Sequence, residues 1–281
     1  MKEDNSSEKM NNKNEDTLRA KNEELKGNKI LIYLCNLIDP INTPLNFGPK
    51  IFKFNWIINA QKTGTIIIMS LLMYYYQNYS KGAWFYLSLH GTYGLIWFLK
   101  DMIFPDKSFQ HKLAILPAFL VTLFLLSYWL MGWEIISGIG DQSPSGKKIF
   151  GCFFLFSIGN ILMLCADLQK FITLKYKNGL IDDLFFKNNR NTNYFGEILV
   201  YLTFAIACGR KEGYLMLISE WIIFFGSRIY MKDLRLARKH GFEKYKNNSY
   251  IILFKFFDSH FLNLIIYLLI ICGIYVFIYK L

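Results

Sequence analysis

The sequence predicts an all-α protein, a polytopic transmembrane bundle of about seven helical spans. Apolar residues make up 53% of its 281 positions and charged residues 19%, against about 45–50% and 25% in ordinary soluble domains. Aromatic residues reach 18% and occur in runs beside leucine and isoleucine, as rings do at the two surfaces of a bilayer. The apolar residues also form stretches close to the 20 residues that a helix needs to cross about 30 Å of hydrocarbon.

The chain divides into four parts. Residues 1–28 are polar and charged without an apolar cluster, which predicts a disordered, cytosolic tail. Residues 29–61 contain an apolar stretch too short to cross and are predicted to lie at the membrane interface. Residues 62–257 form the predicted membrane domain, and 258–281 a last transmembrane helix. The seven predicted spans are 62–79, 83–104, 112–136, 149–166, 194–209, 213–231 and 261–279.

Composition argues against several other classes of protein. The net charge of +11 does not indicate nucleic-acid binding, because the basic residues lie between apolar segments instead of gathering on one soluble face. The five cysteines form no C-x-x-C pair and the four histidines do not cluster, so neither a disulfide framework nor a metal site is predicted. The N-terminal tail lacks the apolar region of a signal peptide.

Lysine and arginine are distributed unequally between the two sides of the predicted bundle. The side of the N-terminus receives 26 of them and the other side 6. Because cytosolic loops are enriched in basic residues, the N-terminus and the loops 167–193 and 228–258 are predicted to be cytosolic. We expect an integral membrane protein of the endoplasmic reticulum.

Polar and ionisable residues gather around the loop after the fourth predicted span, where they are candidates for a functional site. Asp167 and Lys170 close that span, and Asn193 and Glu197 stand four residues apart on one face of the next. Backbone N–H groups at a helix start favour an anion such as phosphate, and Glu197 is placed to accept from a ribose hydroxyl. The alternative is that Asn193 caps the helix and Glu197 pairs with its dipole.

A basic stripe follows the sixth predicted span. Arg228, Lys232 and Arg235 recur at intervals of four and three residues, which places them on one helix face. Such a stripe suits a diphosphate or a 2′-phosphate. Its alternative is attraction to anionic lipid headgroups, worth about 1 kcal/mol per basic residue.

Four motifs in combination resemble one family. They are HGTYGLIWFLKDMIFPD from His90, the turn ADLQK ending at Lys170, RNTNYFGE ending at Glu197, and the segment from Arg228 to Tyr245 with its Lys-Asp pair and its Gly-Phe-x-x-Tyr ending. Together they are similar to the steroid 5-alpha-reductase-like integral membrane proteins, in the branch beside the steroid and enoyl reductases. The resemblance covers about residues 60–255.

The resemblance implies a membrane reductase fold that binds NADPH from the cytosol through its C-terminal half, about residues 149–257. Its expected activity is reduction of a lipophilic unsaturated substrate, steroid-, enoyl- or polyprenyl-like, with the hydride supplied by the nicotinamide. By motif, the expected cofactor-binding residues are Asp167, Lys170, Arg190, Asn193, Tyr194, Glu197, Arg228, Lys232, Asp233 and Tyr245. Lys170 stands where the steroid reductases carry arginine, which loses bidentate geometry.

The substrate half departs from the family. No glutamate lies in the first predicted span, but His90, Tyr93, Trp97 and Lys100 share one face of the second. Tyr93 and His90 are the candidate catalytic residues, each able to act as general acid to a developing enolate oxygen. The alternative is that both belong to the interfacial belt of aromatic residues.

Two other functions remain open. The first is an isoprenylcysteine-type membrane methyltransferase that depends on S-adenosylmethionine. The turn at Asp167 and the Arg228 to Asp233 stripe favour the reductase over it. The second is a non-enzymatic subunit of a membrane-protein complex, which the missing substrate-side acid favours.

Overall fold

The computed structural model describes residues 27–279 and is 72% helix and 2% strand. The all-α prediction is therefore confirmed, whereas the predicted tail 1–28 lies, up to residue 26, outside the described residues. The only strands in the described part of the chain are β1 (Phe52–Lys53) and β2 (Lys112–Leu113), which pair antiparallel with Phe52 opposite Leu113.

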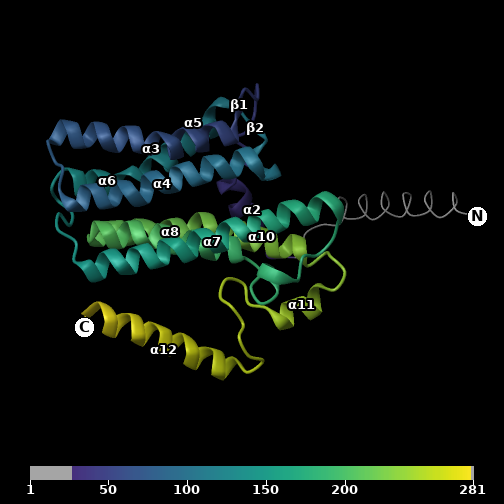
Figure 1. The fold of residues 1–281 in the computed structure, drawn as a ribbon. Helices are drawn as coiled ribbons and strands as arrows, with labels where there is room; N and C mark the ends of the chain where they lie inside the picture. Colours follow the sequence, from purple (N-terminus) through teal and green to yellow (C-terminus); the bar gives the residue numbers. More distant parts are fainter. Residues whose placement is uncertain (1–26, 280–281) are drawn as a thin grey trace, which may run out of the picture.

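Long helices in the described part pack as a bundle (Figure 1). Those before residue 140 are α2 (Lys29–Ile38), α3 (Phe54–Tyr76), α4 (Lys81–Ile103), α5 (Ile115–Ser127) and α6 (Trp129–Ile136). Those after it are α7 (Gly146–Tyr176), α8 (Thr192–Cys208), α9 (Lys211–Glu220), α10 (Gly226–Leu236), α11 (Phe242–Asn248) and α12 (His260–Tyr279). Figure 1 shows α3 and α4 side by side, α7 and α8 side by side below them, and α12 at the edge of the molecule. Short 3₁₀ turns, η1 (Lys107–Phe109) and η2 (Leu184–Phe186), lie in the connections.

The helices follow the predicted spans with four differences. The first begins at Phe54, eight residues before the predicted start, so Lys62 lies inside α3 instead of ahead of it. The third is divided at Tyr128 into α5 and α6. The fourth, α7, continues ten residues past its predicted end, to Tyr176. The sixth is built from α9, a π-helical segment η3 (Trp221–Phe225) and α10.

Two helical segments in residues 27–279, Ile115–Ile136 and Gly146–Tyr176, are long and apolar enough to cross a membrane. The other predicted spans are represented by helices that are shorter or more polar. α3 and α4 have 23 residues each, a length of about 34 Å, but they bury charged side chains such as Lys62 and Lys100. The count of seven spans stays a prediction.

Glycines allow the closest helix approaches. A Cβ at Gly94 of α4 would lie 2.0 Å from the carbonyl oxygen of Lys62 in α3, and one at Gly196 of α8 would lie 2.5 Å from that of Gly159 in α7. Real Cβ atoms do not come so close, so only glycine fits at these crossings. The first crossing sets Lys62 against α4, and the second holds the helix turn that carries Asn193 and Glu197.

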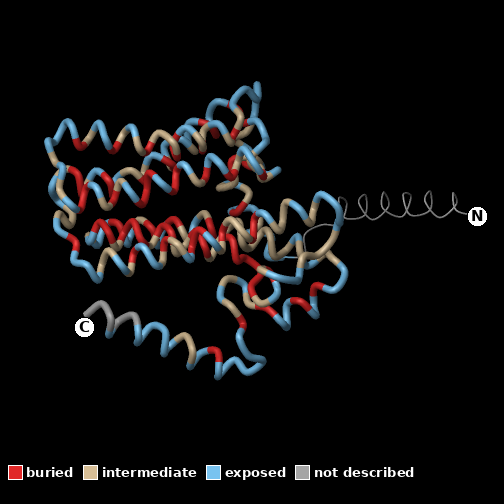
Figure 2. The backbone as a smooth tube through the Cα atoms, viewed as in Figure 1, coloured by how far each residue is buried: buried red, intermediate tan, exposed pale blue. Residues whose placement is uncertain are grey.

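Burial follows the bundle interior (Figure 2). The core contains methionine, tyrosine and phenylalanine side chains from α3, α4, α6 and α8, such as Met69, Tyr86 and Phe204. The outer faces of α3, α4, α5, α7 and α12 expose large apolar side chains, among them Ile67, Leu99, Phe119, Phe153 and Phe261. Contiguous apolar surface of this kind is rare on a soluble monomer.

Candidate functional site

An apolar cavity of about 310 Å³ lies inside the bundle. Its walls come from α2 and the loop after it, α3, α4, η1, α5, α8, the π-helical segment and α10. They consist mainly of leucine, isoleucine, valine, proline and phenylalanine side chains. The polar lining is small and comprises Thr43, Lys62, Tyr128, Tyr194, Glu197, Tyr201 and Arg228. An apolar pocket with a few convergent polar groups is typical of a small-molecule site.

Lys62 brings a positive charge to this apolar wall. Its side chain is only 3% exposed, and its Nζ lies 4.4 Å from the ring centroid of Tyr93, 4.9 Å from Trp97, 5.5 Å from Tyr128 and 4.8 Å from Tyr201. Cation–π attraction to desolvated rings offsets part of the cost of burying the ammonium. No carboxylate among the described residues lies within ion-pair distance of it.

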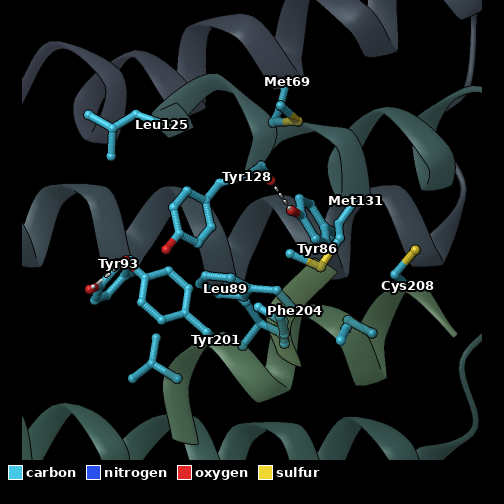
Figure 3. Packing of buried hydrophobic residues seen from close by; sticks show 14 of the residues in the cluster. Met69, Tyr86, Leu89, Tyr93, Leu125, Tyr128, Met131, Tyr201, Phe204 and Cys208 are labelled. Carbon is cyan, nitrogen blue, oxygen red and sulfur yellow. Dashed lines mark hydrogen bonds between the residues drawn. The ribbon is translucent and has the colours of Figure 1, made fainter. Parts of the chain in front are cut away.

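The rings of three tyrosines surround this ammonium, and one of their hydroxyl groups bonds it. Nζ of Lys62 donates a short hydrogen bond to Oη of Tyr201, and Oη of Tyr93 donates to the same oxygen at 3.3 Å. Figure 3 shows the rings of Tyr93, Tyr128 and Tyr201 gathered between their helices. Tyr128 stacks on Tyr201 with ring centroids 4.8 Å apart. Tyr128 and Tyr201 line the cavity, whereas Tyr93 stands behind Tyr201.

Glu197 and Arg228 supply the charges at another part of the wall. Glu197 is 8% exposed, and its electrostatic neighbours are Lys100, Asp167, Lys62 and Arg228. No residue in 27–279 donates a hydrogen bond to its carboxylate. The prediction that Asn193 and Glu197 share the first turns of one helix is confirmed, since α8 begins at Thr192 and buries both.

Asn193 links the helix turn of Glu197 to a buried ion pair between Asp167 and Lys100. Its Nδ2 donates to Oδ1 of Asp167 at 3.0 Å, while its own Oδ1 is buried without a hydrogen-bond partner. Asp167 in turn forms a buried ion pair with Lys100. The predicted helix-cap role for Asn193 does not appear, because the cap position is Asn191 and no side chain bonds there.

A charged crevice runs along the end of the bundle beside the cavity. One lobe, about 320 Å³, is lined by Lys100, Asp106, Lys107, Asp167, Lys170, Lys175 and their apolar neighbours. The second lobe, about 120 Å³, shares Lys170 and Leu174 with the first and is otherwise lined by Ile181, Phe186, Arg190, Lys232, Leu236, Lys239 and Tyr245. This second lobe contains four basic side chains and no carboxylate.

The cavity and the crevice are neighbours. Tyr194 lines the cavity and Lys232 lines the crevice, and Nζ of Lys232 lies 5.7 Å from the centroid of the Tyr194 ring. Likewise Trp97 lines the cavity, and Nζ of Lys100, which lines the crevice, lies 4.4 Å from its ring. One elongated ligand in the crevice would therefore end close to the cavity wall.

Of the lysines that line the second lobe, Lys232 and Lys239 have no carboxylate partner among the described residues. Nζ of Lys232 donates to the carbonyl oxygen of Arg190 at 2.9 Å, and that of Lys239 to the carbonyl of Gly179. Burial, followed by repulsion from Lys170, lowers the pKa of Lys232 to about 7, and burial also lowers the pKa of Lys239. A bound anion would offset these charges.

Asp106 and Lys170 close the first lobe from two sides. They form an ion pair of 2.5 Å between Oδ2 and Nζ. Burial alone would raise the pKa of Asp106, but Lys170 and the Ser108 hydrogen bonds outweigh it and hold this pKa below its ordinary value. Lys170 therefore remains paired at neutral pH and contributes less free charge than Lys232 or Lys239.

Three of the predicted cofactor residues are held by internal bonds. Nε of Arg190 lies 2.7 Å from Oδ1 of Asp233, and its Nη1 donates to the carbonyl of Ser249 at 2.8 Å. Oη of Tyr245 donates to the carbonyl of Phe186 at 2.6 Å. These contacts fasten the loop before α8 to α10 and α11, so they shape the crevice, although Arg190 and Tyr245 also line it.

Neither residue of the predicted catalytic pair, His90 and Tyr93, lines the cavity. The four residues expected on one face of α4 are all buried, but of these only Trp97 lines the cavity. His90 bonds Tyr86 through Nδ1 at 2.9 Å and stacks on Phe204 with ring centroids 4.4 Å apart, contacts typical of a packing role. The basic stripe is divided too: Arg228 lines the cavity, Lys232 lines the crevice, and Arg235 is exposed.

Sequence reasoning missed Lys62 and Tyr201. The signal for Lys62 was available, because an ionisable residue inside an apolar helix is a functional candidate. The predicted span, however, began eight residues too late and placed Lys62 at its edge. Tyr201 lies in a long apolar run and gave no signal. Among residues 27–279, no three histidine, cysteine or carboxylate side chains are placed to hold a metal ion.

Comparison with known proteins assigns the chain to no family. A scan against protein-family models gives no match, and a search of curated proteins gives none either. The resemblance drawn from the motifs therefore stands on those residues alone.

Proposed function

We propose that the protein is a membrane-embedded, NADPH-dependent reductase of a lipophilic unsaturated substrate. The observation that carries this proposal is the adjacency of an apolar cavity with a small polar wall and a basic crevice. A reductase of this type needs both, because the nicotinamide must reach the substrate while the phosphates stay in a polar environment. The family resemblance of the motifs points in the same direction.

Placement in a membrane is supported by the surface of the bundle. Two helical segments are long and apolar enough to cross a membrane, and apolar side chains are exposed on the outer faces of five helices. We propose several spans, a cytosolic N-terminus and the endoplasmic reticulum as location. The basic crevice then opens on the cytosolic side, where the nucleotide is available.

NADPH fits the crevice by charge and by hydrogen bonding. Lys232 and Lys239 have no carboxylate partner and would pair with phosphate groups. Asn193 Oδ1 is buried without a donor, and Glu197 accepts no hydrogen bond from the described residues, so either could accept from a ribose hydroxyl or a carboxamide. When bound, the cofactor supplies the hydride, and this chain orients it and excludes water.

The test is the identity of the copurifying nucleotide and its dependence on the crevice. The full chain is purified in mild detergent, and the released nucleotide is identified by mass spectrometry. We then expect saturable NADPH binding that Lys239→Ala and Lys232→Ala each weaken about tenfold, the effect of a lost charged hydrogen bond of roughly 1.5 kcal/mol. Lys147→Ala, an exposed lysine at the opposite end of α7, is the matched control and should bind normally.

The alternatives predict other results. Copurification of S-adenosylmethionine with no NADPH binding would favour the methyltransferase. A chain that folds but binds neither nucleotide would favour a non-enzymatic membrane subunit. Equal weakening by Lys147→Ala would show that the effect is one of net charge and not of the crevice.

A further inference from the structure

A separate basic pocket lies between the loop before α8, the helix α11 and the segment before α12. Its volume is about 520 Å³, and we call it the α11 pocket. Three lysines line it: Lys187 from the loop, Lys244 from α11 and Lys255 from the segment before α12. The rest of its lining consists of two aspartates, two asparagines and three aromatic side chains. Of all these residues, only Tyr245 also lines the crevice, so the α11 pocket is a place of its own.

The lysines of the α11 pocket have donors that the described residues leave unfilled. Lys187 and Lys244 form no ion pair within residues 27–279. Lys255 is 9% exposed, and its Nζ donates to the carbonyl of Asn247 at 2.6 Å and lies 3.3 Å from Oδ1 of Asp258. An ammonium has three donors, and its pairing with a fully exposed carboxylate such as that of Asp258 is weak. All three lysines are therefore able to donate to a ligand.

The charge of the α11 pocket favours a ligand with one negative charge. Its three lysines face two carboxylates, Asp182 and Asp258, so one positive charge remains unbalanced. A phosphate diester carries one negative charge, and its oxygens accept charge-assisted hydrogen bonds from ammonium groups. A ligand with several phosphates would bring further negative charge beside the two aspartates, and a zwitterion would leave the excess positive charge unbalanced. A single phosphate diester therefore fits best.

Internal hydrogen bonds hold the walls of the α11 pocket together. The backbone N–H of Lys255 donates to the carbonyl of Asn188 at 3.0 Å, and Nδ2 of Asn189 donates to the carbonyl of Ile252 at 2.7 Å. Oη of Tyr245 fastens α11 to the same loop through the carbonyl of Phe186. Walls that are fixed in advance reduce the conformational entropy lost when a ligand binds.

The α11 pocket lies at the foot of an apolar helix. α12 begins at His260, directly after the segment that lines the pocket, and is exposed along most of its length (Figure 2). Oδ1 of Asn263 in its first turn accepts from the backbone N–H groups of Phe256 and Phe257 at 2.8 and 3.0 Å. Both phenylalanine rings line the pocket and are about half exposed. Aromatic side chains beside the end of an apolar helix are typical of the level of lipid headgroups.

We propose that the α11 pocket binds the headgroup of a membrane phospholipid with one net negative charge. Lys187, Lys244 and Lys255 hold the phosphate, and the acyl chains pass Phe256 and Phe257 onto the exposed apolar surface of α12. The proposal rests on the membrane placement proposed above and needs no reductase chemistry. A dissolved phosphate ester would meet the same lysines but would leave the apolar rim uncovered, so a lipid is the ligand that fits the whole site.

The test measures lipid binding to the full chain in detergent by native mass spectrometry. Dioleoyl phosphatidylglycerol and dioleoyl phosphatidylcholine are titrated separately, because they share their acyl chains and differ in headgroup charge. We expect a saturable site for phosphatidylglycerol and weaker binding of phosphatidylcholine. Lys187→Ala and Lys244→Ala should each weaken phosphatidylglycerol binding about fivefold, the contribution of one basic residue at a membrane surface. Both side chains are exposed, so both variants should fold.

A double variant with the same loss of charge is the matched control. Lys246 lies in α11 and Lys177 directly follows α7; both are exposed and neither lines the α11 pocket. Lys177→Ala/Lys246→Ala should bind phosphatidylglycerol as wild type does. Lys187→Ala/Lys244→Ala should bind it about 25-fold less tightly, the product of the two single effects. Equal losses in the two double variants, no loss in the pocket variant, or equal binding of both lipids by wild type would overturn the proposal.

The same headgroup without acyl chains distinguishes a lipid from a soluble phosphate ester. Glycerophosphoglycerol in large excess should leave the bound phosphatidylglycerol in place, because it lacks the contacts with the apolar rim. Its displacement of the lipid would overturn the assignment to a membrane ligand.

NADPH binding separates this proposal from the proposed reductase function. Neither Lys187 nor Lys244 lines the crevice, so the double variant of these two lysines should bind NADPH as wild type does. Loss of both ligands in that variant would overturn the proposal of a separate lipid site. A wild-type chain that binds phosphatidylglycerol at this pocket but no NADPH would refute the reductase and leave the lipid site in place.

Discussion

An alanine at Gly94 tests the helix crossing that positions Lys62. The added Cβ would lie 2.0 Å from the carbonyl oxygen of Lys62, whereas atoms in contact stay about 3.5 Å apart. The helices α3 and α4 must therefore separate by about 1.5 Å. Overpacking of this kind costs about 3 kcal/mol, and the higher helix propensity of alanine returns about 1 kcal/mol, which leaves a net loss of about 2 kcal/mol.

Gly64→Ala is the matched control, because it lies in α3 and its Cβ would meet only the Trp129 ring at 3.8 Å, an ordinary contact. The same propensity gain without a clash should leave the melting temperature equal or slightly higher. At about 2–4 °C per kcal/mol, Gly94→Ala should melt about 4–8 °C below wild type in detergent, followed by circular dichroism. Equal melting temperatures for the two alanine variants would refute the close approach.

Four further predictions concern charge and topology. Because the pKa of Lys232 is lowered to about 7 by burial, NADPH affinity should fall by up to tenfold per pH unit above pH 7 in binding titrations, and not in Lys232→Arg. In the absence of ligand the unfolded chain holds more protons than the folded one between pH 7 and 10, so the free energy of unfolding should rise across that window. Arg190→Ala leaves the half-buried Asp233 without its partner and should cost about 2 kcal/mol; an unchanged melting temperature would contradict this. Cysteines placed at Ser145, the N-cap of α7, and at Lys187, in the connection after α7, should react with an impermeant reagent from opposite sides of the membrane, and labelling of both from one side would contradict the topology.

Patterns carried on one helix could be predicted from the sequence. The buried face of α4 follows from residues at spacings of three and four, and the pairing of Asn193 with Glu197 follows from a spacing of four at a helix start. Both depend only on helix geometry. The long apolar stretches likewise predict helices, although the predicted limits differ by up to ten residues where polar turns continue, as in α7.

Features that depend on contact between helices could not be predicted. Tyr201 lies in an apolar run, and only the packing of α8 on α4, which itself packs on α3, brings its hydroxyl to Lys62. The π-helical segment Trp221–Phe225 has no sequence signal, yet it turns Ile223 and Phe224 toward the cavity. The break between α5 and α6 at Tyr128 has no sequence signal either, because the apolar composition continues through it.

Structural and functional polar residues in this bundle differ in whether their hydrogen-bond donors reach acceptors within the protein. Arg190 and Tyr245 match the family motif, but their donors already reach acceptors of the protein, so their burial stabilises the fold with no ligand present. Lys62, which is buried, and Lys232, which is half-buried, keep ammonium donors unfilled, a state that costs folding free energy and that only a ligand recovers. Such a cost persists in a native fold when something else depends on it. The two lysines lie at the cavity and at the crevice, the two places where the proposed reductase would bind its substrate and its cofactor.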